Sequence, residues 1–160
     1  MRSFACSALL TTLVFAAPVA AEEAPWALCA KAIDRQEQAQ EIPDALLQAV
    51  AVAESGRWNR EAGRTQPWPW TVMAEGRGRY LDSKAEAIAE VEELQARGVR
   101  NIDVGCMQVN LRAHPDAFPN LQTAFDPDAN ADYAARFLRR LRNAHESWTR
   151  AVGYYHSRTT

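Results

Sequence analysis

The stretch IPDALLQAVAVAESG, residues 42–56, decides the fold prediction. Pro43 should open a helix and Gly56 should end it, because proline suits the first turn of a helix and glycine the residue after its end. One face of this helix is apolar and finishes on a carboxylate, since its members recur at helical spacing: Leu47, Val50, Ala51 and Glu54. A carboxyl group held against apolar walls keeps its proton near neutral pH, as a general acid must. From periodicity alone an exposed helix end is the simpler interpretation, so other motifs have to decide.

The rest of the chain indicates a mainly α fold, a single helical domain with one short β-hairpin. Further helices are expected over residues 25–40, 83–96, 126–142 and 146–155. Residues 66–81 change to aromatic and β-branched side chains around a glycine turn, which predicts the hairpin. Residues 101–110 are expected to be mostly a tight connection.

The first residues are typical of an export signal. Arg2 precedes an apolar run over 4–17, and the small residues Val19-Ala20-Ala21 form a cleavage pattern. We therefore expect residues 1–21 to be a signal peptide and residues 22–160 to be one domain, periplasmic and not inserted in a membrane after processing. Without Arg2, 17 basic residues face 20 acidic ones, a net charge of −3 (17 − 20), which argues against a nucleic-acid partner.

Two cysteines would remain after processing, Cys29 and Cys106. Exported proteins meet an oxidising compartment, so we expect a disulfide between them. The three histidines are scattered and there is no CxxC motif, so we expect neither a metal site nor a cofactor. A cysteine peptidase using Cys106 is an alternative that the neighbouring Met-Gln pair disfavours.

Three short motifs resemble the soluble lytic transglycosylases, in the same order along the chain. They are Ala53-Glu54-Ser55-Gly56, Gly105-Cys106-Met107-Gln108-Val109-Asn110 and Tyr155-His156-Ser157. Each motif alone is weak, but their order behind a signal peptide is specific. The resemblance is closest to the subgroup found with conjugation and type IV secretion systems, which makes such a machine a candidate partner.

The resemblance implies a lysozyme-like α+β fold and cleavage of the β-1,4 bond between N-acetylmuramic acid and N-acetylglucosamine in peptidoglycan. The product would carry a 1,6-anhydro-muramoyl end. Glu54 would protonate the glycosidic oxygen and then accept the proton of the sugar's own O6 hydroxyl. The substrate's N-acetyl group would stabilise the positive C1, so no protein nucleophile is required, unlike the two-carboxylate glycosidases.

The resemblance also implies the residues around the substrate. Gln108 would lie near the N-acetyl groups, Tyr155 would bind near Glu54, and Met107 would pack beneath the site. The full set of expected substrate-binding residues is Ser55, Trp70, Met107, Gln108, Asn110 and Tyr155. Trp70, with Trp68, has an aromatic face suited to sugar rings.

Two features depart from the family pattern. His156 stands where the family usually has asparagine, and the family usually continues beyond the position of Thr160. The cleft wall at this end is therefore expected to be incomplete or built by a partner.

Two other functions stay open on the sequence. A hydrolytic lysozyme would need a second carboxylate to position water, and Asp103 lies just before the Gly105 segment. A non-catalytic wall-binding or secretion-assembly protein could keep the fold, but such a protein would not need the acid Glu54.

Overall fold

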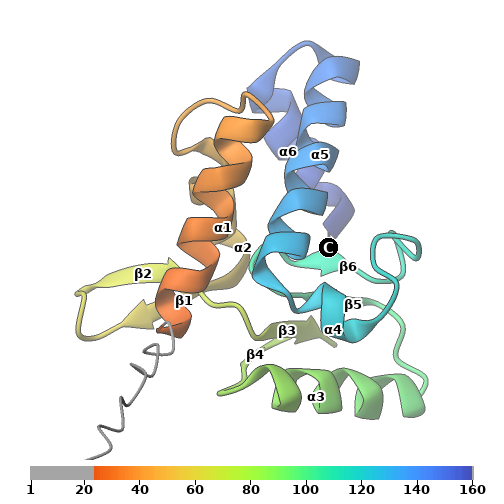
Figure 1. The fold of residues 1–160 in the computed structure, drawn as a ribbon. Coiled ribbons are helices and arrows are strands. Elements are labelled where there is room, and N and C mark those ends of the chain that lie inside the picture. The colour runs from red at the N-terminus through yellow and green to blue at the C-terminus, as the bar shows by residue number, and fades with distance from the viewer. Residues whose placement is uncertain (1–23, 160) are drawn as a thin grey trace, which may run out of the picture.

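The computed structural model describes residues 24–159, with side chains up to residue 157. Four helices form one lobe: α1 (Pro25–Ala39), α2 (Leu46–Ser55), α5 (Pro127–His145) and α6 (Trp148–Thr159). The elements between α2 and α5 form a second, sheet-containing lobe beside it (Figure 1). The prediction of a mainly α fold is confirmed.

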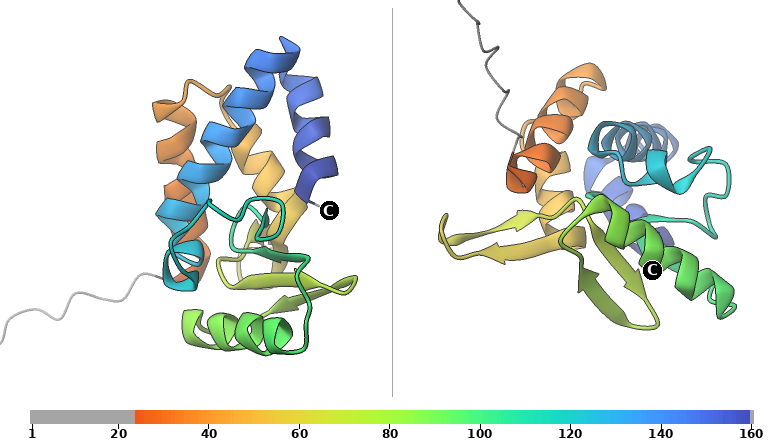
Figure 2. Two further views of the ribbon diagram at one scale, coloured as in Figure 1. Left: turned by 90° about the vertical axis from the view of Figure 1, so that its right-hand side faces the viewer. Right: turned by 60° about the horizontal axis from the view of Figure 1, so that its bottom comes forward.

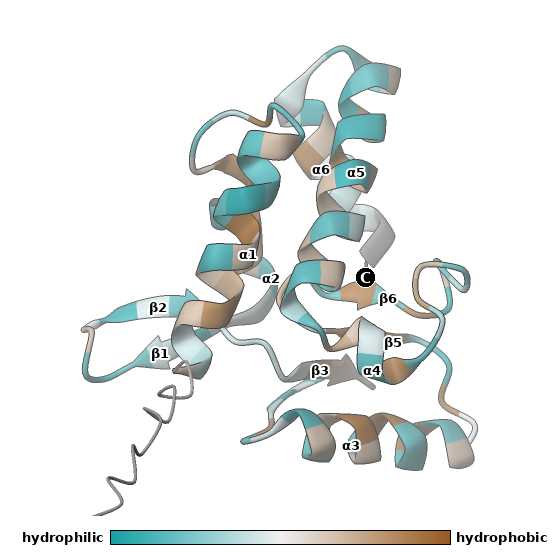
Figure 3. Ribbon diagram, in the orientation of Figure 1, coloured by the Kyte–Doolittle hydropathy of each residue, from teal (hydrophilic) through white to brown (hydrophobic). Residues whose placement is uncertain are grey.

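The helical lobe is built on apolar stripes that face inward. On α5 the buried residues recur at helical spacing, namely Ala131, Ala134, Ala135, Leu138 and Leu141. Hydrophilic and hydrophobic residues alternate along the turns of α1 and α5 (Figure 3). Burial of such stripes supplies most of the stability of helices in globular proteins.

The start of α2 depends on a neighbouring helix. Ala45 adopts a left-handed conformation with φ 62° and offers no capping side chain, so α2 begins at Leu46 and not at Pro43 as predicted. The carboxylate of Glu37 on α1 accepts hydrogen bonds from the backbone N–H groups of Ala45 (3.1 Å), Leu47 (2.6 Å) and Gln48 (3.1 Å). These bonds satisfy donors that a helix start otherwise leaves without partners, and the negative charge suits the helix dipole.

The second lobe is centred on a four-stranded antiparallel sheet of order β4-β3-β5-β6. Its strands are β3 (Thr71–Ala74), β4 (Arg77–Tyr80), β5 (Ile102–Val104) and β6 (Val109–Asn110). The sheet lies between α3 (Lys84–Ala96) and the helical lobe (Figure 2). The short helix α4 (Leu121–Ala124) closes this lobe's own apolar core, which includes Val91, Ile102 and Phe125.

The predicted hairpin over 66–81 is confirmed as β3 and β4, but the sequence did not predict the other strands. A second hairpin, β1 (Gly56–Asn59) and β2 (Arg64–Pro67), follows α2 directly and projects from the body (Figure 1). The expected connection over 101–110 contains β5 and β6, so that part of the prediction was wrong. β5 is buried at every position and shows no alternation, which removes the usual sequence signal of a strand.

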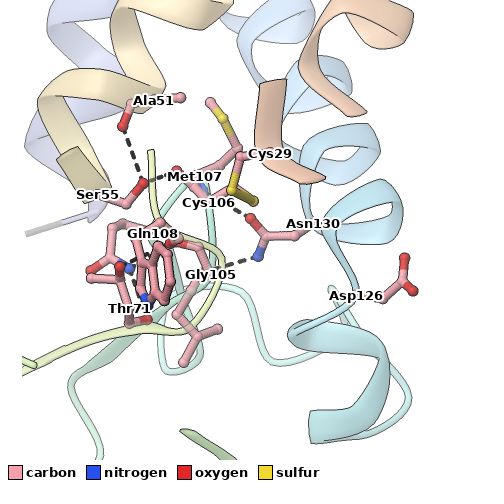
Figure 4. Close-up of a disulfide and its surroundings, with 12 residues drawn as sticks. Cys29, Ala51, Ser55, Thr71, Gly105, Cys106, Met107, Gln108, Asp126 and Asn130 are labelled. Atoms are coloured by element: carbon pink, nitrogen blue, oxygen red, sulfur yellow. Dashed lines mark hydrogen bonds between the residues drawn. A yellow bond between two sulfur atoms is a disulfide. The ribbon is translucent and has the colours of Figure 1, made fainter. Parts of the chain in front are cut away.

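A disulfide joins the two parts of the molecule. Cys29 on α1 is bonded to Cys106, as predicted, at a sequence separation of 77. Figure 4 shows the bond beside the turn that follows β5. Over residues 24–159, none of the helices is both long and apolar enough for a membrane span. The expected signal peptide, residues 1–21, lies outside the described residues.

Candidate active site

Glu54 lies in the last turn of α2, where the apolar stripe of that helix meets α6. Its side chain is 10% exposed. It lines a pocket of about 370 Å³ whose other walls are Val50, Ala53, Val152, Gly153 and His156. Burial among these mainly apolar walls raises the pKa of Glu54, although a hydrogen bond from His156 and that residue's charge act in the opposite direction. The group thus combines access to a pocket with a bias toward its protonated form.

Three titratable side chains surround Glu54. His156 on α6 places Nδ1 3.1 Å from Glu54 Oε1. Tyr155, also on α6, and Asp103 on β5 are electrostatically coupled to Glu54, whose negative charge contributes to raising the pKa of both. For Asp103 the pKa rises to about 6, with burial as the main cause.

The turn that follows β5 is bonded to the residue after Glu54 and to α6. The hydroxyl of Ser55, the next residue along α2, donates to the carbonyl of Cys106 (2.6 Å) and to that of Ala51 (3.2 Å). The hydroxyl of Tyr155 donates to the carbonyl of Met107 (2.8 Å). These bonds fix the end of α2 and the middle of α6 to the same short segment, and so set the position of Glu54 relative to α6.

Asn130 holds this turn from the opposite side, a role that was not predicted from the sequence. Its Oδ1 accepts from the backbone N–H of Met107 (2.9 Å), and its Nδ2 donates to the carbonyls of Val104 and Ala124 (3.0 Å each). Gly105 makes room for it, since a Cβ there would lie 2.5 Å from Asn130 Nδ2 and the residue has φ 81°. The capping residue Asp126 starts α5 and thereby places Asn130 in its first turns. Figure 4 shows Asn130 and Ser55 on either side of the turn.

Gln108 is held within the same turn. Its Nε2 donates to the carbonyls of Thr71 (3.1 Å) and Gly105 (2.9 Å), and its backbone has φ 48°. Its Oε1 is buried and has no hydrogen-bond partner among the described residues. A non-glycine residue in this conformation carries strain, which tends to occur where function constrains the backbone.

Asn110 holds the second carboxylate. It lies opposite Asp103 in the register of β5 and β6, and its Nδ2 donates to Asp103 Oδ1 and Asn101 Oδ1 (2.7 Å each). Asp103 is 6% exposed and lines a different pocket of about 290 Å³ at the β3–β4 turn. This carboxylate is thus fixed by the sheet.

The structure brings five of the six expected substrate-binding residues together under Glu54, but it buries them. These five have exposures of at most 2%: Ser55, Met107, Gln108, Asn110 and Tyr155. In this structure their side chains bind neighbouring groups of the protein or pack in the core. Their contact with a substrate stays a prediction. Trp70 is partly buried, and its contact with a sugar ring also stays a prediction.

Trp68 is not available for stacking on a sugar. It is 6% exposed, packs edge-on against Trp26 and Trp70, and is covered by the guanidinium of Arg57 at 4.5 Å from the ring centre. Its Nε1 donates to the carbonyl of Leu81 (2.7 Å). These contacts make Trp68 a structural residue between the two lobes.

The chemistry available here is proton transfer. Residues 24–159 contain no cluster of three or more His, Cys, Asp or Glu side chains suited to hold a metal ion. Cys106 is consumed by the disulfide, which is evidence against the cysteine peptidase alternative. Glu54 supplies a largely buried carboxyl group at the wall of a pocket, and the charge of a second carboxylate, Asp103, interacts with it.

Comparison with known proteins gives one match. The family model described as "Transglycosylase SLT domain" matches residues 31–159, which contain all three sequence motifs and both lobes except for the start of α1. No curated protein matches the chain, and no solved structure does so either.

Proposed function

Because this match spans most of the chain, the protein belongs to the transglycosylase SLT domain family, and we propose that Glu54 is the one proton-transfer group of its reaction. Membership of the family makes the protein an enzyme of lytic-transglycosylase type that cleaves peptidoglycan. The observation that carries the proposal is the position of Glu54 at the wall of the pocket between α2 and α6, with its pKa raised by burial.

The proposed reaction has two proton transfers. Glu54 first donates its proton to the oxygen of the β-1,4 bond, the bond from that oxygen to C1 of N-acetylmuramic acid breaks, and the substrate's N-acetyl group stabilises the positive C1. The Glu54 carboxylate then accepts the proton of the O6 hydroxyl while O6 bonds to C1, giving the 1,6-anhydro end. Glu54 finishes protonated and no water is consumed. A group that serves as acid and then as base works best with a pKa near the working pH, and burial moves Glu54 in that direction.

Hydrolysis is the second candidate, and one observation favours it. Asp103 lies near enough to Glu54 for their charges to interact, and most glycosidases use a pair of neighbouring catalytic carboxylates. The hydrogen bond from Asn110 and the 6% exposure of Asp103 favour a structural role instead. The proposal therefore assigns Asp103 no direct part in bond cleavage.

We propose that the protein acts in the periplasm after removal of residues 1–21. The cell wall is accessible there, and the compartment is oxidising enough for the disulfide to form. A conjugation or type IV secretion machine remains the proposed partner on the sequence resemblance alone.

Product analysis in isotopically labelled water tests the reaction. Purified mature protein is incubated with peptidoglycan, and the muropeptides are analysed by mass spectrometry, with Glu54→Gln as the control for background cleavage. We expect anhydro ends without label from the solvent. Reducing ends carrying one labelled oxygen would contradict transglycosylation and establish hydrolysis.

A further inference from the structure

Among the side chains that the structure describes, His156 is the one polar group besides Glu54 on the wall of the α2–α6 pocket. It follows Tyr155 on α6, and its Nδ1 lies 3.1 Å from Glu54 Oε1. Its side chain is 68% exposed, whereas that of Glu54 is 10% exposed. The imidazole therefore sits between the buried carboxyl group and the solvent, at the position where the sequence departs from the transglycosylase pattern.

We propose that His156 is a positioning residue for the proton transfer, whose Nδ1–H binds Oε1 of Glu54 and leaves Oε2 to exchange the proton with the sugar. This inference rests on the proposed function of Glu54. The reason is the asymmetry of a carboxylic acid: one oxygen carries the proton and the other accepts hydrogen bonds. A donor fixed at Oε1 places the acid proton on Oε2. The opposite tautomer, with Nδ1 as an acceptor, would draw the proton to Oε1 and away from the substrate.

The same hydrogen bond favours the transition state over the ground state. As Glu54 gives up its proton, negative charge develops on the carboxylate, and hydrogen bonds to a charged acceptor are about twice as strong as neutral ones. Interactions that strengthen in the transition state are those that accelerate the reaction. A fixed donor at Oε1 therefore assists the acid step and stabilises the carboxylate that acts as base in the next step.

Two influences on the pKa of Glu54 oppose each other. Burial raises the pKa of Glu54, and His156, by hydrogen bond and by charge, lowers it. Tyr155 on α6 and Asp103 on β5 are the other coupled groups. On the remaining neighbouring elements, Glu37 of α1 caps the opposite end of α2, and Arg57 of β1 covers Trp68. Among the described residues, His156 is the side chain whose hydrogen bond and charge lower the pKa of Glu54, so removing it should raise that pKa.

Three variants test the role by activity: His156→Ala, His156→Asn and the control Arg150→Ala, which removes an exposed charge from the same helix. For His156→Ala we expect kcat to fall roughly tenfold with KM nearly unchanged, because orientation of the reacting group is lost. The fall in rate at high pH should move to higher pH. His156→Asn, which keeps an amide donor, should recover most of kcat, and Arg150→Ala should match the wild type.

A measurement independent of activity separates this inference from the proposed function. The carboxyl carbon of Glu54 is followed by isotope-labelled NMR across pH, in wild type and in His156→Ala. We expect the titration midpoint to rise when His156 is removed. An unchanged midpoint, or an unchanged kcat and pH profile, would overturn the inference. The labelled-water experiment decides transglycosylation by itself, whichever way this titration turns out.

Discussion

The two lobes each place one carboxylate near the site, and the two differ in how they are held. Glu54, from the helical lobe, lies at the end of a helix and lines the pocket between α2 and α6, in contact with His156. Asp103, from the sheet lobe, is 6% exposed and bound by Asn110 across the register of β5 and β6. Burial raises the pKa of both groups. A raised pKa and a place at the wall of a pocket therefore do not identify the acid, because Asp103 has both. Glu54 differs in its contact with the exposed side chain of His156.

The turn between β5 and β6 is what keeps this difference in place. Ser55 and Tyr155 from the helical lobe bind its carbonyl groups, and Asn130 binds its N–H. Loosening the turn should therefore affect the positions of both carboxylates, whereas substitution of one carboxylate should affect that group alone.

Removing the disulfide should have the largest effect on stability. For Cys29→Ala combined with Cys106→Ala, the closed loop of 77 residues gives an upper value of roughly 4.5 kcal/mol in the chain-entropy model. Denaturant unfolding of oxidised wild type, reduced wild type and the double variant would measure it. Equal midpoints for all three proteins would show that the bond contributes nothing.

Asn130→Ala should cost about 3 kcal/mol, because it leaves buried backbone groups of the turn without partners. Activity should also fall, since the turn positions Glu54. Asn120→Ala is the matched control: Asn120 caps the exposed start of α4, and loss of such a cap costs about 1 kcal/mol. Similar losses of stability in the two variants, with full activity in Asn130→Ala, would contradict the role given to the turn.

Asp103→Asn should have the smallest effect on rate, less than about tenfold, because loss of a true acid or base costs about a hundredfold or more. Its effect on stability has a defined sign. The pKa of Asp103 is raised from 3.8 to about 6 in the folded protein, so its contribution is fully present below pH 3.8 and is lost as pH rises through about 6. The Asn variant should lack this decline, which amounts to about 3 kcal/mol at most. Thermal unfolding between pH 3 and 8 would reveal it, and a parallel decline in both proteins would contradict the assignment.

The structural features that could be predicted from the sequence are those that depend on local periodicity and on short motifs. The stripes of α2 and α5 and the β3–β4 hairpin are of this kind, and so is the place of Glu54 at the end of its helix. The Cys29–Cys106 bond followed from compartment chemistry.

The features that the sequence did not predict depend on distant partners. Glu37 caps α2 only because α1 lies beside it, and Asn130 reaches the turn from a helix more than twenty residues away in sequence. A polar residue on a helix gives no signal of such a role. The burial of Gln108 and Asn110 likewise arises from the packing of the turn against both lobes. The motifs therefore indicated which segments to consider, while the structure shows which of their side chains are buried and which line the pocket.

The most direct test of the central claim is the cleavage rate of purified Glu54→Gln on peptidoglycan, measured beside Asp103→Asn. Glutamine keeps the shape and hydrogen-bonding capacity of Glu54 but cannot exchange the proton. We predict a loss of at least ~100-fold, with unchanged glycan binding. Stability near pH 7 should be equal or greater, because a buried acid with a raised pKa destabilises the fold once it ionises. Near wild-type cleavage by folded Glu54→Gln, or a comparable loss in Asp103→Asn alone, would contradict the claim that Glu54 is the single proton-transfer group.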